Sequence, residues 1–214
     1  MNVIRKVLSA EDLARVTARL ATSGWVNGLE TAGSQAAEVK RNLQLAADSP
    51  EANELGELIK KSVLAHPRFT PLALPRRMSL PMMSRYDVGM EYGAHTDNAL
   101  RTGRDGLRTD LAATLFLSPP DSYEGGALAI GQNSLRLPAG DLVLYPATSV
   151  HRVTPVTRGV RLAAVFWVQS LIRSHEQREI LLDIFDLLET LGSHPNAVNL
   201  AAIQQNLLRM WAEH

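Results

Sequence analysis

The chain of 214 residues contains no cysteine. This absence excludes a disulfide framework and a thiolate metal site, and it is typical of proteins in a reducing compartment. The N-terminus carries Arg5 and Lys6 but continues into Ser9-Ala10-Glu11-Asp12 instead of an apolar core, so it does not resemble a secretory signal. We therefore expect a cytoplasmic location.

Net charge is also missing, because 22 acidic residues balance 22 basic ones. The composition gives no electrostatic reason to expect a nucleic-acid partner. No stretch of apolar residues is long enough to span a bilayer, so we expect no membrane partner. The length suits one well-buried core with a small appendage.

Helical spacing of apolar residues marks the chain up to about residue 67. Ser9 is placed to cap a helix that continues until Gly24. We expect a second helix over residues 36–47, and a third that starts at Pro50 and runs through Val63.

Two amphipathic helices are expected after residue 173. Ser174 can cap the first, which ends at Gly192, and the second reaches Trp211. Their apolar faces need a partner. We expect that partner to be the core of their own domain, and a homodimer is the less favoured alternative.

The middle of the chain, from about residue 71 to 170, has the pattern of sheet and turns. Residues 110–117 are apolar on both faces, as expected of a central strand, and Pro119-Pro120 ends it. Many short strands with frequent turns indicate a sandwich or jelly roll. We therefore predict an α+β protein with a jelly-roll core, N-terminal helices packed on the sheet and a C-terminal helical extension.

The sequence His95-Thr96-Asp97 is a candidate metal-binding pair. Side chains two apart on an extended segment point to the same side, so His95 and Asp97 can reach one ion. His151, after a stretch that reads as sheet, is the candidate third ligand. Two imidazoles and one carboxylate leave three octahedral positions open, as in non-haem Fe(II) oxygenases that bind a chelating cosubstrate and O₂.

Arg161 lies in an otherwise apolar run, where an unpaired guanidinium is costly, so we expect it to bind an anion. Residues 150–154 and 160–168 read as strands that can form a hairpin. That hairpin would place Arg161 roughly opposite His151. A five-carbon 2-oxo diacid could then chelate the metal and present its far carboxylate to Arg161.

Residues 98–108 are polar, basic and rich in glycine, and they directly follow the metal pair. A mobile lid over the substrate and a solvated hairpin tip are both compatible with this composition, and the position favours the lid. The arginines of this segment would suit an anionic or peptide substrate. They are Arg101, Arg104 and Arg108.

Several segments together resemble the PKHD-type hydroxylases, bacterial Fe(II)/2-oxoglutarate-dependent dioxygenases related to prolyl 4-hydroxylase. The resemblance covers nearly the whole chain and is strongest over residues 84–99. Further matches follow in family order at residues 123–126, 137–141, 145–146, 149–153 and 158–161, and the upstream residues 32–35 and 39–45 also resemble that group.

The resemblance implies that His95, Asp97 and His151 bind Fe(II) and that Arg161 anchors 2-oxoglutarate. Tyr86 is implied as a hydrogen-bond donor to the far carboxylate of 2-oxoglutarate, although an inward core aromatic is an equal alternative. Trp167 is implied as an aromatic of the pocket wall, and a buried tryptophan of the sheet is a nearly equal alternative. Asn98 and Arg101 are further candidate residues of the substrate pocket, because of their position directly after the metal pair. Prolyl 4-hydroxylases have lysine where this chain has Arg161, which weakens any inference that proline is the substrate.

The same resemblance implies a double-stranded β-helix. It places a dioxygenase domain over residues 1–172, with the jelly roll over about 71–170, and a helical extension over 173–214. The implied reaction hydroxylates an unreactive C–H bond of an unidentified small molecule or peptide with O₂, releases succinate and CO₂, and uses ascorbate as reductant. A cupin-like metal enzyme without 2-oxoglutarate and a non-catalytic iron or 2-oxoglutarate sensor are the alternatives.

Overall fold

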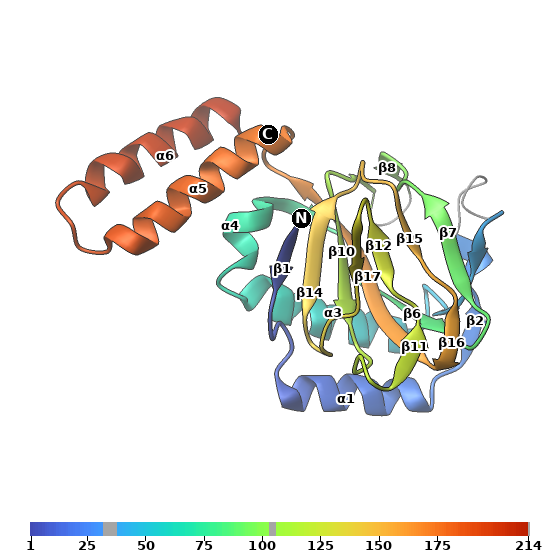
Figure 1. Cartoon of the computed structure of the whole chain (residues 1–214). Helices are drawn as coiled ribbons and strands as arrows, with labels where there is room; N and C mark the ends of the chain where they lie inside the picture. Colours follow the sequence, from blue (N-terminus) through green and yellow to red (C-terminus); the bar gives the residue numbers. More distant parts are fainter. Residues whose placement is uncertain (32–37, 103–105, 214) are drawn as a thin grey trace.

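The computed structural model of the protein describes residues 1–31, 38–102 and 106–213. Within these ranges, short antiparallel strands form two facing sheets, and helices cover one side of the resulting jelly roll (Figure 1). This architecture confirms the predicted α+β class and the double-stranded β-helix.

The larger sheet of the described chain has eight strands. In its interior lies β10 (Leu111–Phe116), paired on both sides and with all its residues buried, as predicted for a central strand. Seven strands follow the order β1 (Asn2–Ile4), β14 (Leu142–Pro146), β10, β17 (Arg161–Ser170), β6 (Met82–Tyr86), β4 (Leu43–Leu45) and β2 (Trp25–Asn27), and β5 (Pro75–Met78) also pairs with β17.

The facing sheet is smaller. Its described strands follow the order β13 (Asn133–Leu135), β12 (Leu128–Ile130), β15 (His151–Val153), β7 (Glu91–His95) and β3 (Lys40–Arg41). Two short ribbons complete the strands: β11 (Tyr123–Gly125) with β16 (Val156–Gly159), and β8 (Leu100–Arg101) with β9 (Leu107–Arg108).

The predicted hairpin between residues 150–154 and 160–168 is wrong. β15 pairs with β12 and β7 in the smaller sheet, whereas β17 pairs with β10, β6 and β5 in the larger one. The intervening residues are not a tight turn, because they form β16 and pair with β11. The chain therefore crosses from one sheet to the other, and Arg161 faces the metal pair across the jelly roll.

Two N-terminal helices form where the sequence predicts them, and each has a serine cap. In α1 (Ala10–Ala21), Ser9 Oγ accepts a hydrogen bond of 3.0 Å from the backbone N–H of Asp12. In α3 (Pro50–Ala65), Ser49 caps the first turn and proline occupies a position where its missing N–H costs nothing. A single-turn helix, α4 (Phe69–Ala73), and the 3₁₀ turn η1 (Gly28–Thr31) were not predicted.

The predicted helix over residues 36–47 is wrong for its described part, because β3 and β4 occupy that stretch. Residues 36 and 37, like the family-like residues 32–35, lie outside the described ranges. Lys40, Asn42 and Gln44 are all buried, at 3 to 6% exposure. Their alternation has the two-residue period of a strand, and pairing of β4 with β2 and β6 outweighs the local helical propensity.

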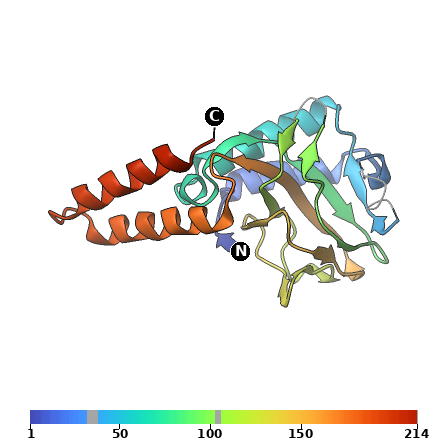
Figure 2. The ribbon, with the colours of Figure 1, turned by 90° about the horizontal axis from the view of Figure 1, so that it is seen from above.

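The C-terminal residues form a helical hairpin that projects from the jelly roll (Figures 1 and 2). Its first helix, α5 (His175–Leu191), is capped by Ser174 as predicted and buries Leu181, Leu182 and Ile184. The second, α6 (Ala197–Trp211), packs along α5 and has no buried residue. The expected packing on the domain core therefore holds for α5 alone, and both the homodimer and the domain boundary at residue 172 stay predictions.

Two apolar clusters lie on opposite faces of the larger sheet. One joins that sheet to α1 and α3, and the other fills part of the space between the two sheets. Along β10, Leu111, Ala113 and Leu115 belong to the first, whereas Ala112 and Phe116 belong to the second. The second cluster forms the apolar wall of the site described below. None of the described helices combines the length and apolar character needed to cross a membrane.

Candidate metal and cosubstrate site

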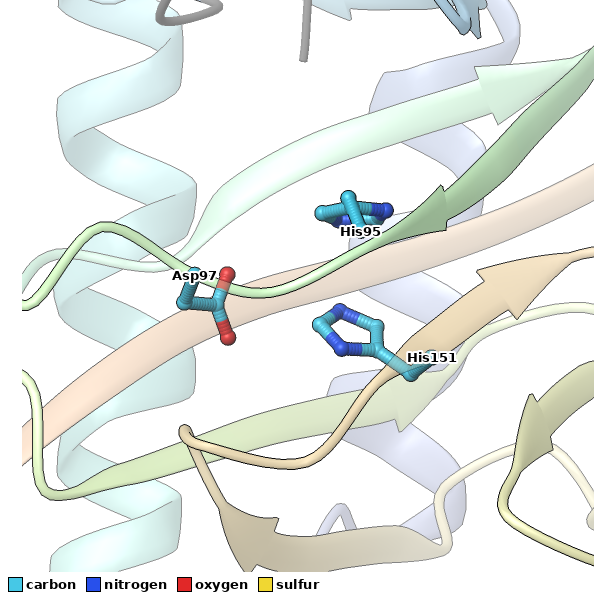
Figure 3. A group of neighbouring side chains, drawn as sticks. All are labelled: His95, Asp97 and His151. Carbon is cyan, nitrogen blue, oxygen red and sulfur yellow. The ribbon is translucent and has the colours of Figure 1, made fainter. Parts of the chain in front are cut away.

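His95, Asp97 and His151 converge between the two sheets (Figure 3). His95 ends β7, Asp97 follows it in the next turn, and His151 begins β15, the neighbouring strand. One ligand atom from each lies within 4.8 Å of the others. His95 and His151 are direct partners in the register of the two strands, so the antiparallel pairing itself brings the imidazoles together.

Both imidazoles are oriented by the same kind of hydrogen bond. Nδ1 of His95 lies 2.8 Å from the carbonyl oxygen of Gly93, and Nδ1 of His151 lies 3.0 Å from that of Ser149. Because a carbonyl can only accept, Nδ1 must donate in each case. In the neutral imidazole, this leaves the remaining nitrogen, Nε2, with a free lone pair for a metal.

Aromatic rings pack against both imidazoles. The ring of Tyr92 stacks on His95 with centroids 3.6 Å apart, and Tyr145 meets His151 edge-on at 5.1 Å. Burial lowers the pKa of His95 to about 4, with smaller contributions from His151 and Lys40, against the hydrogen bond to Gly93. His95 is therefore neutral at physiological pH, as a metal ligand must be.

One oxygen of the Asp97 carboxylate lacks a hydrogen-bond partner among the described residues. This atom, Oδ2, is buried. Burial raises the pKa of Asp97, whereas His151, the Trp167 indole N–H and Arg101 act in the opposite direction. Trp167 is near enough for this effect without reaching hydrogen-bonding geometry. A buried carboxylate of this kind gains most from a cation bound between it and the histidines.

Arg161 is the largest fully buried side chain of the described residues, at 1% exposure. Its Nε and Nη1 atoms make no hydrogen bond within the described part of the chain. The guanidinium carbon lies 5.0 Å from the ring centroid of Tyr86 and 5.6 Å from that of Phe116. Such contacts contribute about 1 to 2 kcal/mol, less than the several kcal/mol that burial of an ion costs. Arg161 therefore fits a bound anion.

Tyr86 lies directly opposite Arg161 in the pairing of β6 with β17 and lines the same cavity. Burial raises the pKa of the Tyr86 hydroxyl, and Arg161 offsets part of that rise. The hydroxyl is consequently protonated and able to donate. The structure thus brings together the two residues that the sequence linked to the cosubstrate.

Tyr123 was missed as a site residue. Its hydroxyl is buried and has no hydrogen-bond partner among the residues that the structure describes. Burial raises the pKa of Tyr123, and the nearby Arg161 offsets part of that rise. Gly126 makes room here, because a Cβ on it would lie 3.1 Å from Arg161 Cδ and 2.9 Å from Val156 Cγ2. The resemblance of residues 123–126 to the family was the available indication that Tyr123 and Gly126 lie near the site.

Lys40, Asn42 and Gln44 also line the cavity and were missed, since their segment was predicted to be helical. The polar alternation along residues 40–44 was the available signal. Gly93 allows β3 to approach, because a Cβ at Gly93 would lie 2.7 Å from Val39 Cβ. Burial, with a smaller contribution from Arg101, lowers the pKa of Lys40 to about 8.

The three predicted substrate-pocket residues all line the cavity: Trp167, Asn98 and Arg101. The guanidinium carbon of Arg101 lies 4.1 Å from the Trp167 ring centroid. Arg108 instead points away, to Asp110 and Glu213. Residues 103–105, including Arg104, lie outside the described ranges. On either side of them, β8 pairs with β9, and the role of residues 98–108 as a lid stays a prediction.

Two family models match this chain. Residues 81–169 match the 2OG-Fe(II) oxygenase superfamily, and residues 176–213 match the PKHD-type hydroxylase C-terminal domain. The first range contains the metal triad, Tyr86, Arg161 and Trp167. The second is the projecting helical hairpin.

Known proteins of similar sequence and fold agree with these matches. A PKHD-type hydroxylase of Beijerinckia indica is 48% identical, with 98% of both chains covered. A prolyl-4-hydroxylase structure from Pseudomonas putida is 19% identical, with a TM-score of 0.52 over 79% of this chain and 91% of that chain. The structure of HygX from Streptomyces hygroscopicus with nickel, 2-oxoglutarate and hygromycin B is 15% identical, with a TM-score of 0.55 over 79% and 83%. Sequence identity over nearly the full length is decisive, and the chain belongs to the PKHD-type hydroxylases, within the Fe(II)- and 2-oxoglutarate-dependent oxygenases.

Proposed function

We propose that His95 and His151, through Nε2, and the carboxylate of Asp97 hold the Fe(II) of this hydroxylase. The support is the 4.8 Å clustering of their ligand atoms, the shared Nδ1 hydrogen bonds and the unpartnered Asp97 Oδ2. Nitrogen and oxygen ligands of this set suit Fe(II) and leave coordination positions open.

The cosubstrate anchor is Arg161, assisted by Tyr86. The single observation that carries this assignment is a guanidinium with 1% exposure whose Nε and Nη1 have no partner among the described residues. Its planar fork matches the far carboxylate of 2-oxoglutarate. Tyr86 can donate a further hydrogen bond from across the β6–β17 pair.

When bound, Fe(II) and 2-oxoglutarate activate O₂, so that one oxygen atom hydroxylates the substrate and the other enters succinate as CO₂ is released. The chain's own residues position these reactants. Tyr92 and Tyr145 fix the imidazoles, and the apolar cluster between the sheets keeps water away. Ascorbate, as in the family, is proposed as the reductant that keeps the iron in its Fe(II) form.

A cupin-like enzyme without 2-oxoglutarate has less support. That alternative calls for a further glutamate or histidine ligand, and the described residues that line the cavity include none beyond His95, Asp97 and His151. A non-catalytic sensor is equally disfavoured by a complete set of three ligands. We also propose a cytoplasmic location, supported by the absence of cysteine.

Anaerobic titration of the purified apoprotein with Fe(II) and then 2-oxoglutarate tests this function. We expect a visible charge-transfer band that is absent in His151→Ala and that needs far more 2-oxoglutarate in Arg161→Ala. Arg158→Ala is the matched control, because Arg158 is an exposed arginine of the same chain segment, paired with Glu124. Iron binding without any band in the wild-type protein would overturn the assignment.

A further inference from the structure

The side chain of Asn42 is a buried amide to which the proposed function assigns no role. Asn42 is 4% exposed and lines the cavity. Neither its Nδ2 nor its Oδ1 atom has a hydrogen-bond partner within the described part of the chain. A buried amide that makes no hydrogen bond destabilises a protein. A ligand that forms a hydrogen bond with this amide would offset that loss.

Strand register places Asn42 in one row with the two proposed cosubstrate residues. In the pairing of β4 with β6, Leu43 is opposite Arg85, so the next position, Asn42, comes opposite Tyr86. Tyr86 is in turn opposite Arg161 in the pairing of β6 with β17. Opposite residues on neighbouring antiparallel strands point to the same face of a sheet, and these three all line the cavity. Tyr86 therefore has Arg161 on one side and Asn42 on the other.

The backbone at Gly28 holds the Asn42 side chain in this position. The Gly28 N–H donates a hydrogen bond of 2.9 Å to the carbonyl oxygen of Asn42. A Cβ at Gly28 would lie 1.9 Å from Asn42 Oδ1, so the amide occupies the space that a larger residue would fill. Burial raises the pKa of Tyr86, and Arg161 and Asn42 both offset part of that rise. The amide thus lies close to the Tyr86 hydroxyl, although the two lack hydrogen-bonding geometry.

The next row of the same wall differs in its hydrogen bonding. Gln44 and Ser84 are opposite each other, and Gln44 Nε2 donates a hydrogen bond of 3.4 Å to Ser84 Oγ. The third member of that row, Ala163, is apolar. Among the described residues of these two rows, buried polar atoms without a partner occur only in the row of Arg161. This contrast indicates that the ligand of the Asn42 amide binds at the level of the guanidinium.

A carboxylate bound at this level can accept another hydrogen bond. Its two oxygens offer about four lone-pair sites in all. The planar fork of Arg161 supplies two donors, and the Tyr86 hydroxyl supplies a third. A side-chain amide on the other side of Tyr86 can supply the next donor. Because an amide is neutral, it adds this hydrogen bond without burying a second positive charge.

We infer that Asn42 is a third residue of the cosubstrate anchor, and that its side-chain N–H donates a hydrogen bond to the far carboxylate of 2-oxoglutarate. This inference rests on the proposed function, which assigns Arg161 and Tyr86 to the same carboxylate. The three residues come from three neighbouring strands, β4 with its preceding residue, β6 and β17.

Anaerobic titration of the Fe(II)-loaded protein with two ligands tests the inference by binding instead of turnover. Both 2-oxoglutarate and 2-oxopentanoate can chelate the metal through a keto acid, but 2-oxopentanoate has a methyl group in place of the far carboxylate. Asn42→Leu should raise the Kd for 2-oxoglutarate about tenfold and leave that for 2-oxopentanoate unchanged. Asn42→Asp, of equal size, should weaken 2-oxoglutarate binding further, because it places a negative charge beside the carboxylate.

Urea unfolding of the apoprotein separates this role from a structural one. Asn42→Leu removes two polar atoms that lack partners and nearly keeps the side-chain volume, so the variant should be at least as stable as the wild type. Asn53→Leu is the matched control, because Asn53 lies on α3 and its Nδ2 donates a hydrogen bond of 3.0 Å to the Ser49 carbonyl oxygen. This control should lose stability and keep the wild-type Kd for 2-oxoglutarate.

Two results would overturn the inference: an unchanged Kd for 2-oxoglutarate in Asn42→Leu, or a destabilised variant that loses affinity for both ligands equally. Either result leaves the proposed function intact if the wild-type protein forms the charge-transfer band and Arg161→Ala weakens it. A wild-type protein that forms no band with Fe(II) and 2-oxoglutarate would overturn the proposed function itself.

Discussion

Arg161 and Tyr86 occupy opposite positions on adjacent strands of the larger sheet, with the guanidinium carbon 5.0 Å from the tyrosine ring centroid. Both residues line the cavity, on the sheet that faces the strands of His95 and His151. A cation buried this completely destabilises the free protein and favours the protein with a bound anion.

Replacing Arg161 should therefore have opposite effects on stability and on binding. Arg161→Met removes a buried charge of similar length, so we expect the apoprotein to be unchanged or more stable by about 1 kcal/mol. Affinity for 2-oxoglutarate should fall by about 100-fold, because two charge-assisted hydrogen bonds are lost. Urea unfolding and the charge-transfer titration measure the two effects, and a destabilised apoprotein would show that Arg161 already has a strong partner.

Gly126 should matter to cosubstrate binding through its contact with Arg161. Gly126 has a φ of +57° and Gly131 a φ of +56°, but a Cβ at Gly131 would meet nothing within 4 Å. Both alanine variants should lose about 1 to 2 kcal/mol of stability from backbone strain. Gly126→Ala alone should raise the Kd for 2-oxoglutarate, since its Cβ displaces Arg161. Equal Kd values in the two variants would contradict this account.

The stability of the apoprotein should depend on His95 in mildly acidic solution. The folded-state pKa of about 4 is below the ordinary 6.5, so between these values the unfolded chain binds more protons, and stability falls as pH falls. Wild type should lose about 1 to 2 kcal/mol more than His95→Gln between pH 7.5 and pH 5. The raised pKa of Asp97 makes stability rise as pH falls, but this effect is present in both proteins and does not enter their difference. Urea unfolding at the two pH values measures the difference, and parallel profiles would contradict it.

Asp110 should contribute more to stability than Glu213, although both pair with Arg108. Asp110 has a side-chain exposure of 6%, receives two hydrogen bonds from Arg108, at 2.7 and 2.9 Å, and accepts a third from the Ser170 N–H. Asp110→Asn should cost about 2 to 3 kcal/mol, as expected for a broken buried network. Glu213 is 38% exposed, so Glu213→Gln should cost less than about 1 kcal/mol. Chemical denaturation checks both, and similar losses would argue against the difference in burial as the cause.

The homodimer predicted as the less favoured alternative can be tested on α6. Val198, Ile203 and Met210 are 52 to 74% exposed on this helix. Sedimentation or light scattering of the full chain gives the oligomeric state. If a dimer forms through α6, Ile203→Glu should convert it to a monomer, whereas Lys61→Glu on the distant helix α3 should not.

The sequence by itself determined the features that depend on neighbouring residues. The Ser9, Ser49 and Ser174 caps act within one turn of their helices, so they define the starts of α1, α3 and α5. The His95-Thr96-Asp97 spacing likewise places two potential ligands on one side of the chain wherever that segment is extended. Resemblance to a known family then indicated the correct fold and reaction class.

Only the tertiary structure decided which strands face one another. Locally, residues 150–154 and 160–168 look like a hairpin. In the structure, β15 pairs with β12 and β7, whereas β17 pairs with β10 and β6 in the opposite sheet. These partners are far away in sequence, so the local pattern does not reveal them. Residues 40–44 have a polar pattern that suits either a helix or a strand, and pairing with β6 and β7 selects the strand. The strand brings Lys40 to the cavity. The sequence alone did not show this, because strand pairing depends on contacts between residues that are far apart in the chain.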